Sequence, residues 1–112
     1  MTQRIEIAKA FSKYPAGRYI IDGNESGERF RDSFLLPALH AGNVEIVLDG
    51  VAGLPSSFLE EALGGLIRKG ISLHMLEERL TIIAETPRMA SYPEQAWRYI
   101  RDAAKSEAPE AA

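Results

Sequence analysis

The chain has 112 residues, of which 46% are hydrophobic and 26% charged, and its formal net charge is −3 at pH 7. This length fits one domain with one hydrophobic core, and the composition is typical of a globular chain rather than a disordered one. The acidic balance disfavours nucleic acid or an anionic membrane as the main partner, because both select basic surfaces. The absence of cysteine excludes disulfides, and no apolar run approaches the roughly 20 residues that span a bilayer. We therefore expect a cytoplasmic domain.

The first part of the chain predicts a β-hairpin followed by a helix. Residues 2–11 alternate between apolar and polar side chains, which is typical of a half-buried strand. After the turn at residues 14–17, residues 18–21 are predicted to return as the second strand. Hydrophobic residues then recur at helical spacing from residue 30 to residue 41. Pro37 lies inside this helical pattern and predicts a kink or two abutting short helices.

The second part predicts strands and helices in alternation. The predicted elements are a buried strand at 44–48, an amphipathic helix at 57–69, a short helix at 72–79, a second buried strand at 80–84 and a last helix from 91. Residues 1–102 are expected to form the domain, and residues 103–112, rich in Ala and Glu, a flexible tail.

This order of elements predicts an α/β fold. Strands separated by helices favour parallel pairing with crossovers that cover the sheet. We expect about four strands in a mixed sheet, consisting of the N-terminal hairpin and the parallel strands, with helices mostly on one side.

The most informative stretch is the start of the helix at 57–69. Ser57 and Glu60 fit a capping box, in which each side chain pairs with a backbone N–H that the helix leaves free. A helix needs only one such cap, so Ser56 has no structural role in this interpretation. Ser56 would lie where the helix dipole favours negative charge, including that of a phosphate group.

Several separated motifs, in this order, resemble the bacterial STAS-like domains of unassigned function. The motifs are Gly17-Arg18-Tyr19, Asp22-Gly23, Ser26-Gly27-Glu28-Arg29-Phe30-Arg31, Leu36-Pro37-Ala38-Leu39 and the stretch from Ser56 to Leu66. The two serines at a helix start are also distantly similar to the STAS domain of anti-sigma-factor antagonists. That resemblance implies a partner that is a histidine-kinase-like ATPase or an anti-sigma factor, and it implies that Ser56 is phosphorylated. Leu54-Pro55 and Phe58 depart from the Asp and Gly of the antagonists' motif.

We therefore predict a non-catalytic regulatory module that binds another protein, and no cofactor or metal. Its predicted contact residues are Pro55, Ser56, Ser57, Phe58, Asp22, Arg29 and Arg31. Phe58 would serve as an interface anchor if it is exposed, and as a core ring if it is buried. The alternative function is a small-molecule or nucleotide sensor, in which the backbone amides at the helix start hold a phosphate group.

Overall fold

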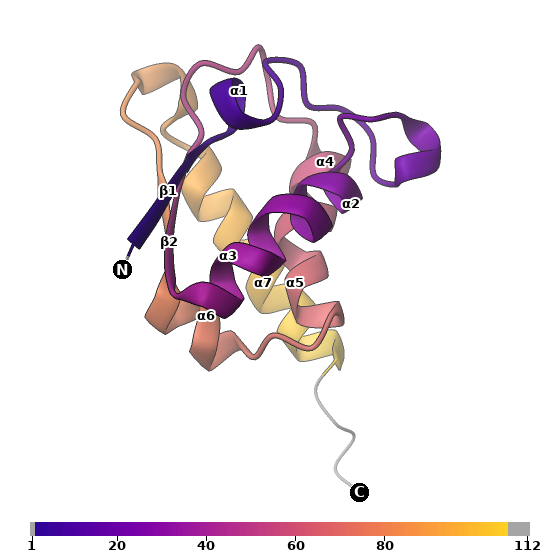
Figure 1. The fold of residues 1–112 in the computed structure, drawn as a ribbon, viewed down its shortest axis with the longest axis vertical. Helices are drawn as coiled ribbons and strands as arrows, with labels where there is room; N and C mark the ends of the chain where they lie inside the picture. The colour runs from indigo at the N-terminus through magenta and orange to yellow at the C-terminus, as the bar shows by residue number, and fades with distance from the viewer. Residues whose placement is uncertain (1, 108–112) are drawn as a thin grey trace, which may run out of the picture.

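Residues 2–107 are described by a computed structural model, in which a three-stranded sheet lies beside a set of helices (Figure 1). The strand order is β1-β2-β3 and both pairings are parallel. The strands are β1 (Thr2–Glu6), β2 (Asn43–Val47) and β3 (Leu80–Ile83).

Two of the helices are composite, because a π-helical turn interrupts each without ending it. The first consists of α2 (Gly27–Phe30), η2 (Arg31–Leu35) and α3 (Leu36–Ala41), and the second of α4 (Ser56–Leu59), η3 (Glu60–Gly64) and α5 (Gly65–Arg68). The other helical elements are α1 (Ile7–Ala10), α6 (Leu73–Arg79), α7 (Tyr92–Glu107) and the 3-10 turns η1 (Ile20–Asp22) and η4 (Pro87–Met89).

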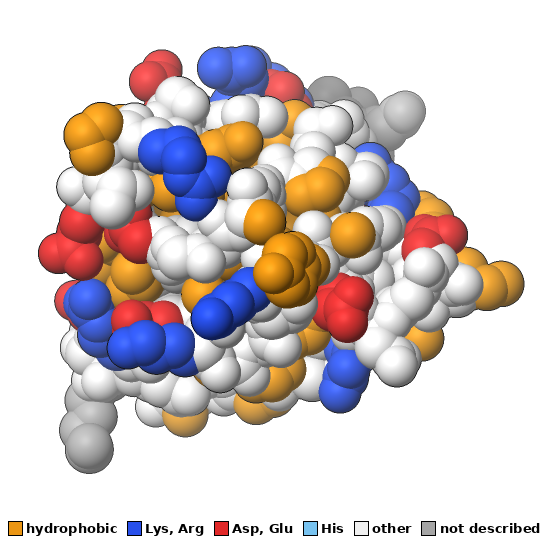
Figure 2. All heavy atoms as spheres, turned by 90° about the horizontal axis from the view of Figure 1, so that it is seen from above, with side chains coloured by type: hydrophobic (Ala, Val, Ile, Leu, Met, Phe, Trp, Pro, Cys, Tyr) orange, Lys and Arg blue, Asp and Glu red, His pale blue; other side chains and the backbone are white. Residues whose placement is uncertain are grey.

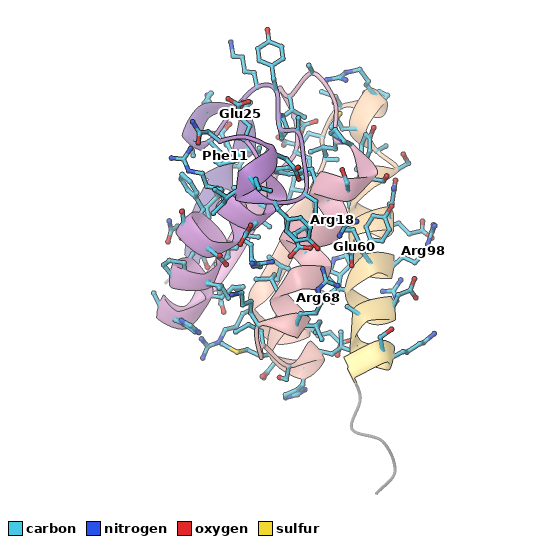
Figure 3. All side chains as sticks on the ribbon, turned by 90° about the vertical axis from the view of Figure 1, so that its right-hand side faces the viewer. Phe11, Arg18, Glu25, Glu60, Arg68 and Arg98 are labelled. Atoms are coloured by element: carbon cyan, nitrogen blue, oxygen red, sulfur yellow. The ribbon has the colours of Figure 1, made fainter. Side chains whose placement is uncertain are left out.

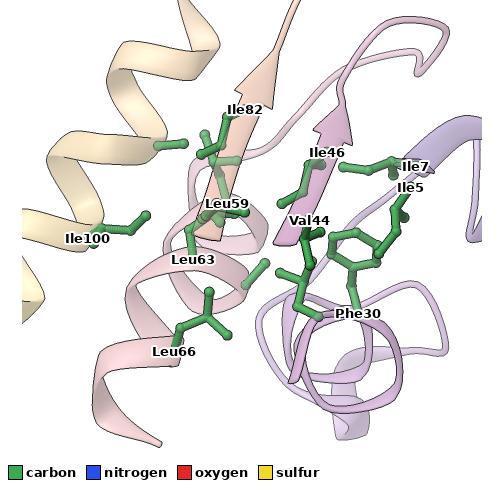
Figure 4. Packing of buried hydrophobic residues seen from close by; sticks show 14 of the residues in the cluster. Ile5, Ile7, Phe30, Val44, Ile46, Leu59, Leu63, Leu66, Ile82 and Ile100 are labelled. Atoms are coloured by element: carbon green, nitrogen blue, oxygen red, sulfur yellow. The ribbon is translucent and has the colours of Figure 1, made fainter. Parts of the chain in front are cut away.

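The register of the strands separates a buried face of the sheet from a polar one. Ile5, Ile46 and Ile82 share one row and are all buried, as Figure 4 shows from close by. The neighbouring row places Arg4 beside Glu45, and their side chains form a 3.6 Å ion pair on the opposite face. Successive side chains of a strand point to opposite faces, so the helices cover mainly the isoleucine face, and on the opposite face Val47 is also buried.

The predicted N-terminal hairpin is wrong, and the sheet has three parallel strands rather than four in mixed order. The strand ends at Glu6, and residues 7–10 form α1. Residues 18–21 were predicted as the second strand. Instead, residues 18 and 19 form a bend, and residues 20 and 21 belong to η1. The backbone of this segment pairs locally: the Arg18 carbonyl accepts from the Glu28 N–H, and the Ile20 N–H donates to the Glu28 carboxylate. These bonds satisfy groups that a strand would have offered to the sheet.

Pro37 does not end its helix, because the π-helical turn η2 precedes it. Proline at the second position of α3 donates no backbone hydrogen bond, and its ring crowds the carbonyl four residues earlier. The wider π turn, closed by bonds to the fifth residue, occupies the stretch where that conflict arises.

The first predicted helix begins three residues earlier than expected, at Gly27, and the elements predicted from residue 44 onward are confirmed to within one residue, apart from the end of the chain. The predicted tail begins too early, since α7 continues to Glu107 and Ala103 is buried against the core. The rest of that tail, residues 108–112, lies outside the described residues. Among residues 2–107, no helix is both long enough and apolar enough to cross a bilayer.

The first turns of α2 and α4 touch backbone to backbone at Gly27. A β-carbon at Gly27 would overlap the carbonyl oxygen of Phe58 and would lie 3.0 Å from the backbone nitrogen of Ala62. Backbone atoms cannot move aside as the end of a side chain can. The absence of a side chain at Gly27 therefore fixes how closely the two composite helices approach.

Replacing Gly27 by alanine should destabilise the domain by about 1–3 kcal/mol, the usual cost of forcing extra volume into a packed site. Urea unfolding followed by circular dichroism measures the change. Gly53→Ala is the matched control, because nothing lies within 4 Å of a β-carbon there. A Gly27→Ala variant as stable as Gly53→Ala would contradict this packing.

Candidate functional site

The helix start at α4 differs from the predicted capping box. Pro55 occupies the N-cap position, Ser56 is the first helical residue, and no side chain caps the helix. Ser57 is the second helical residue, two positions after the N-cap, and therefore does not act as the cap. The carboxylate of Glu60 accepts hydrogen bonds from Arg18 and Arg68 instead.

The residues predicted around this helix start divide into exposed and buried ones. Pro55 and Ser56 are exposed and Ser57 is half-buried. Phe58 is fully buried, with its ring centroid 6.0 Å from that of Phe30 and 6.1 Å from that of Phe11. Phe58 is therefore a core ring and not an interface anchor.

Of the three remaining predicted contact residues, two are exposed and one is not. Asp22 is exposed and accepts a 2.9 Å hydrogen bond from the Tyr19 N–H, and exposed Arg29 donates to the Asn24 carbonyl. Arg31 is only 3% exposed. Its prediction as a surface contact is wrong, because its guanidinium points inward to a carboxylate, that of Glu61.

Arg31 belongs to a charge cluster that joins three parts of the fold. The charge cluster comprises six side chains: Arg18, Arg31, Asp32, Glu60, Glu61 and Arg68. Arg18 comes from the segment between α1 and α2, Arg31 and Asp32 from η2, and the others from η3 and α5. Three positive and three negative charges therefore meet where these segments pack together.

Glu60 and Glu61 share their arginine partners. Arg68 binds Glu60 through two nitrogens at 2.8 and 2.9 Å, and it reaches Glu61 at 3.1 Å. Arg18 bonds to both carboxylates, to Glu61 at 3.2 Å. Figure 3 shows Arg18, Glu60 and Arg68 close together beside the α4–α5 helix. Two-nitrogen pairing of this kind fixes geometry as well as charge.

The charge cluster shifts the titration of Glu60. Burial alone raises the pKa of Glu60, but hydrogen bonds and charge from Arg68 and Arg18 outweigh it, so this pKa lies below its ordinary value. Within the described residues, no buried side-chain nitrogen or oxygen lacks a partner, and no group of His, Asp or Glu could hold a metal ion. The charge cluster is thus internally satisfied, which suits a structural role.

The segment that carries Arg18 also has an apolar surface, which the sequence pattern did not predict. We name residues 12–26 the η1 loop. Tyr14 is 70% exposed, Tyr19 49%, Ile20 50% and Ile21 91%. The strand prediction treated Ile20 and Ile21 as sheet residues, whereas the glycines at both ends of the run, Gly17 and Gly23, were the available signal for a loop.

Arg31→Met should cost about 3–5 kcal/mol, because it leaves a buried carboxylate with less compensation. Arg4→Met, which removes an exposed ion pair, should cost no more than about 1 kcal/mol. Chemical denaturation of both variants gives the comparison. If the two variants had the same free energy of unfolding, the buried ion pair would stabilise the domain no more than the exposed one does.

The pKa of Glu60 makes stability depend on pH in a definite direction. A carboxyl whose pKa is lower in the folded chain stabilises it above the unfolded-state pKa, near 4.3, and that stability is lost as pH falls through the folded-state pKa. Melting temperature should therefore fall less steeply below about pH 4.5 in Glu60→Gln than in the wild type. The exposed Glu77→Gln serves as control, because Glu77 lies outside the charge cluster, and equal slopes in Glu60→Gln and Glu77→Gln would contradict the role of the arginines at Glu60.

A comparison with protein families matches residues 26–88 to the family described as "STAS-like domain of unknown function (DUF4325)". The match includes both composite helices, β2, β3 and Ser56, and it begins after Arg18 and η1. No curated protein and no solved structure matches the chain. Because the match covers more than half of its 112 residues, the chain belongs to the family of STAS-like domains of unknown function.

Proposed function

We propose that this domain is a non-catalytic regulatory module that binds another protein, with Ser56 at the centre of the contact. The observation that carries the proposal is the state of Ser56: its side chain is exposed at a helix start and takes no part in capping. The helix behind it is fixed, since Phe58 and Leu59 are fully buried. A free hydroxyl on a rigid, exposed turn is accessible to a partner.

Similarity to the anti-sigma-factor antagonists supports a particular class of partner, a histidine-kinase-like ATPase or an anti-sigma factor. The contact would include Pro55, Ser56 and Ser57, and extend to Asp22 and Arg29. Gly27 places the start of α2 directly against the start of α4, so residues near both helix starts share one region of the surface.

Phosphorylation of Ser56 would switch this contact. A phosphate group adds close to two negative charges at neutral pH. Near the first turn of α4 the helix dipole tolerates that charge, so the domain itself would stay folded. A partner surface that matched the uncharged hydroxyl would lose its fit, and the complex would dissociate.

The arrangement of polar groups favours this function over a nucleotide sensor. A cavity of about 450 Å³ lies at the beginning of β1 and β2, lined by Thr2, Gln3, Ala38, Ala41, Gly42 and Asn43. Ser56 follows β2 at the opposite end of that strand, and no charged side chain lines the cavity. A phosphate-bearing ligand would find no cationic group there.

Affinity capture with a non-hydrolysable ATP analogue, and separately with ATP, tests the proposal. With the analogue, the wild-type domain should retain a stoichiometric histidine-kinase-like ATPase, and Ser56→Glu should lower its recovery at least tenfold. With ATP, recovery should fall and mass spectrometry should find phosphate on Ser56. Ser33→Glu is the control, because Ser33 is an exposed serine on η2. Equal recovery with Ser56→Glu and the wild type would refute a contact at this helix start.

A further inference from the structure

We infer that the η1 loop forms a second contact surface, which inserts an apolar knob into a pocket with a basic rim on a partner protein. The apolar knob consists of Tyr19, Ile20 and Ile21. All three are at least about half exposed, and Ile21 is 91% exposed. Large apolar side chains gathered on one exposed segment mark interaction sites more often than single ones do.

The apolar knob is ordered by hydrogen bonds to its own backbone. The Asp22 N–H donates to the Tyr19 carbonyl at 2.8 Å, and the Gly23 N–H donates to the Ile20 carbonyl at 3.0 Å. Two carboxylates complete the turn: Asp22 accepts from the Tyr19 N–H at 2.9 Å, and Glu28 from the Ile20 N–H at 2.8 Å. The exposed side chains are therefore presented on a fixed frame, which lowers the entropy lost on binding.

The frame is attached to the rest of the fold by polar groups. The Gly27 N–H donates to Gly17 and the Glu28 N–H to Arg18, each at 3.0 Å, which ties the loop to the start of α2. The Arg18 side chain bonds to Glu60 and Glu61 on η3. Pro15 is a buried apolar residue of the loop, whereas Tyr14, Tyr19, Ile20 and Ile21 all remain exposed.

Charge and shape decide what kind of surface fits the apolar knob. Residues 19–29 contain three acidic side chains, Asp22, Glu25 and Glu28, and one basic side chain, Arg29. The turn projects from the body of the domain at the right of Figure 1, and Figure 2 shows hydrophobic and acidic side chains together at that edge. A convex apolar turn with an acidic border is complementary to a concave apolar pocket bordered by Lys and Arg.

A second copy of this chain fits the apolar knob poorly. Two knobs in contact would place their acidic borders against each other. Two convex surfaces would also bury roughly several hundred Å² in total, below the ~1,200 Å² at which stable complexes begin. We therefore assign the surface to a different protein.

Photo-crosslinking tests this assignment separately from the contact at Ser56. A benzophenone amino acid at position 21 should capture one protein in cells, and the same group at the exposed position 77 on α6 should not. The captured protein is then purified and titrated against the domain by calorimetry. Ile21→Asp should weaken binding at least 100-fold with an unchanged melting temperature. Glu77→Lys should bind like the wild type, and affinity should fall as NaCl rises from ~0.05 to ~0.5 M.

Three outcomes would overturn the inference: no specific crosslink at position 21, a crosslink only to a second copy of the chain, or full affinity in Ile21→Asp. An affinity that does not change with salt would contradict the basic rim proposed for the partner's pocket. The same crosslinker at position 56 reports on the proposed function. Capture at 21 without capture at 56 keeps this inference and rejects the contact at Ser56, and the reverse pattern does the opposite.

Discussion

The pairing of Arg31 with Glu61 is the constraint on which the arrangement of the helices depends. Both side chains are almost completely buried, at 3% and 7% exposed, so neither charge can be left alone without a large cost. A β-carbon at Gly65 would collide with the Arg31 guanidinium, so the pair in its present position occupies the space that glycine leaves open. Together with the backbone contact at Gly27, the pair sets how the two composite helices cross, and that crossing positions the start of α4.

The same cluster connects buried charge to the surface through its two outer arginines. Arg68 shares Glu60 and Glu61 with Arg18, and both arginines are about one-third exposed on their side chains. If the Arg18 side chain moves away, Glu60 keeps both hydrogen bonds from Arg68, and Glu61 keeps its hydrogen bond from Arg31. No buried carboxylate is then left unpaired. The Arg18 side chain, which helps to attach the η1 loop, can therefore leave the cluster without leaving a buried carboxylate unpaired.

What the sequence could predict depended on whether local pattern and long-range contact agreed. The apolar run of β2 and the stripe of the α4–α5 helix are decided by burial, and both were predicted closely. Glu60 fits a capping box by spacing, but arginines 42 residues earlier and 8 residues later take its carboxylate. Residues 18–21 look like a strand in isolation, and the pattern does not show that the neighbour of β1 is β2. Long-range pairing therefore decided the elements that local spacing could not.

The position of Glu60 gives the two proposed surfaces a physical connection. Ser56 and Glu60 are four residues apart on one helix, so their side chains project from the same face one turn apart. A negative charge added at Ser56 would attract the partly buried guanidinium of Arg18 that is paired with Glu60. Because Arg18 anchors the η1 loop, that attraction would act directly on the frame that holds Tyr19, Ile20 and Ile21. A modification at the helix start would then affect how the apolar knob is held, without any change in the core.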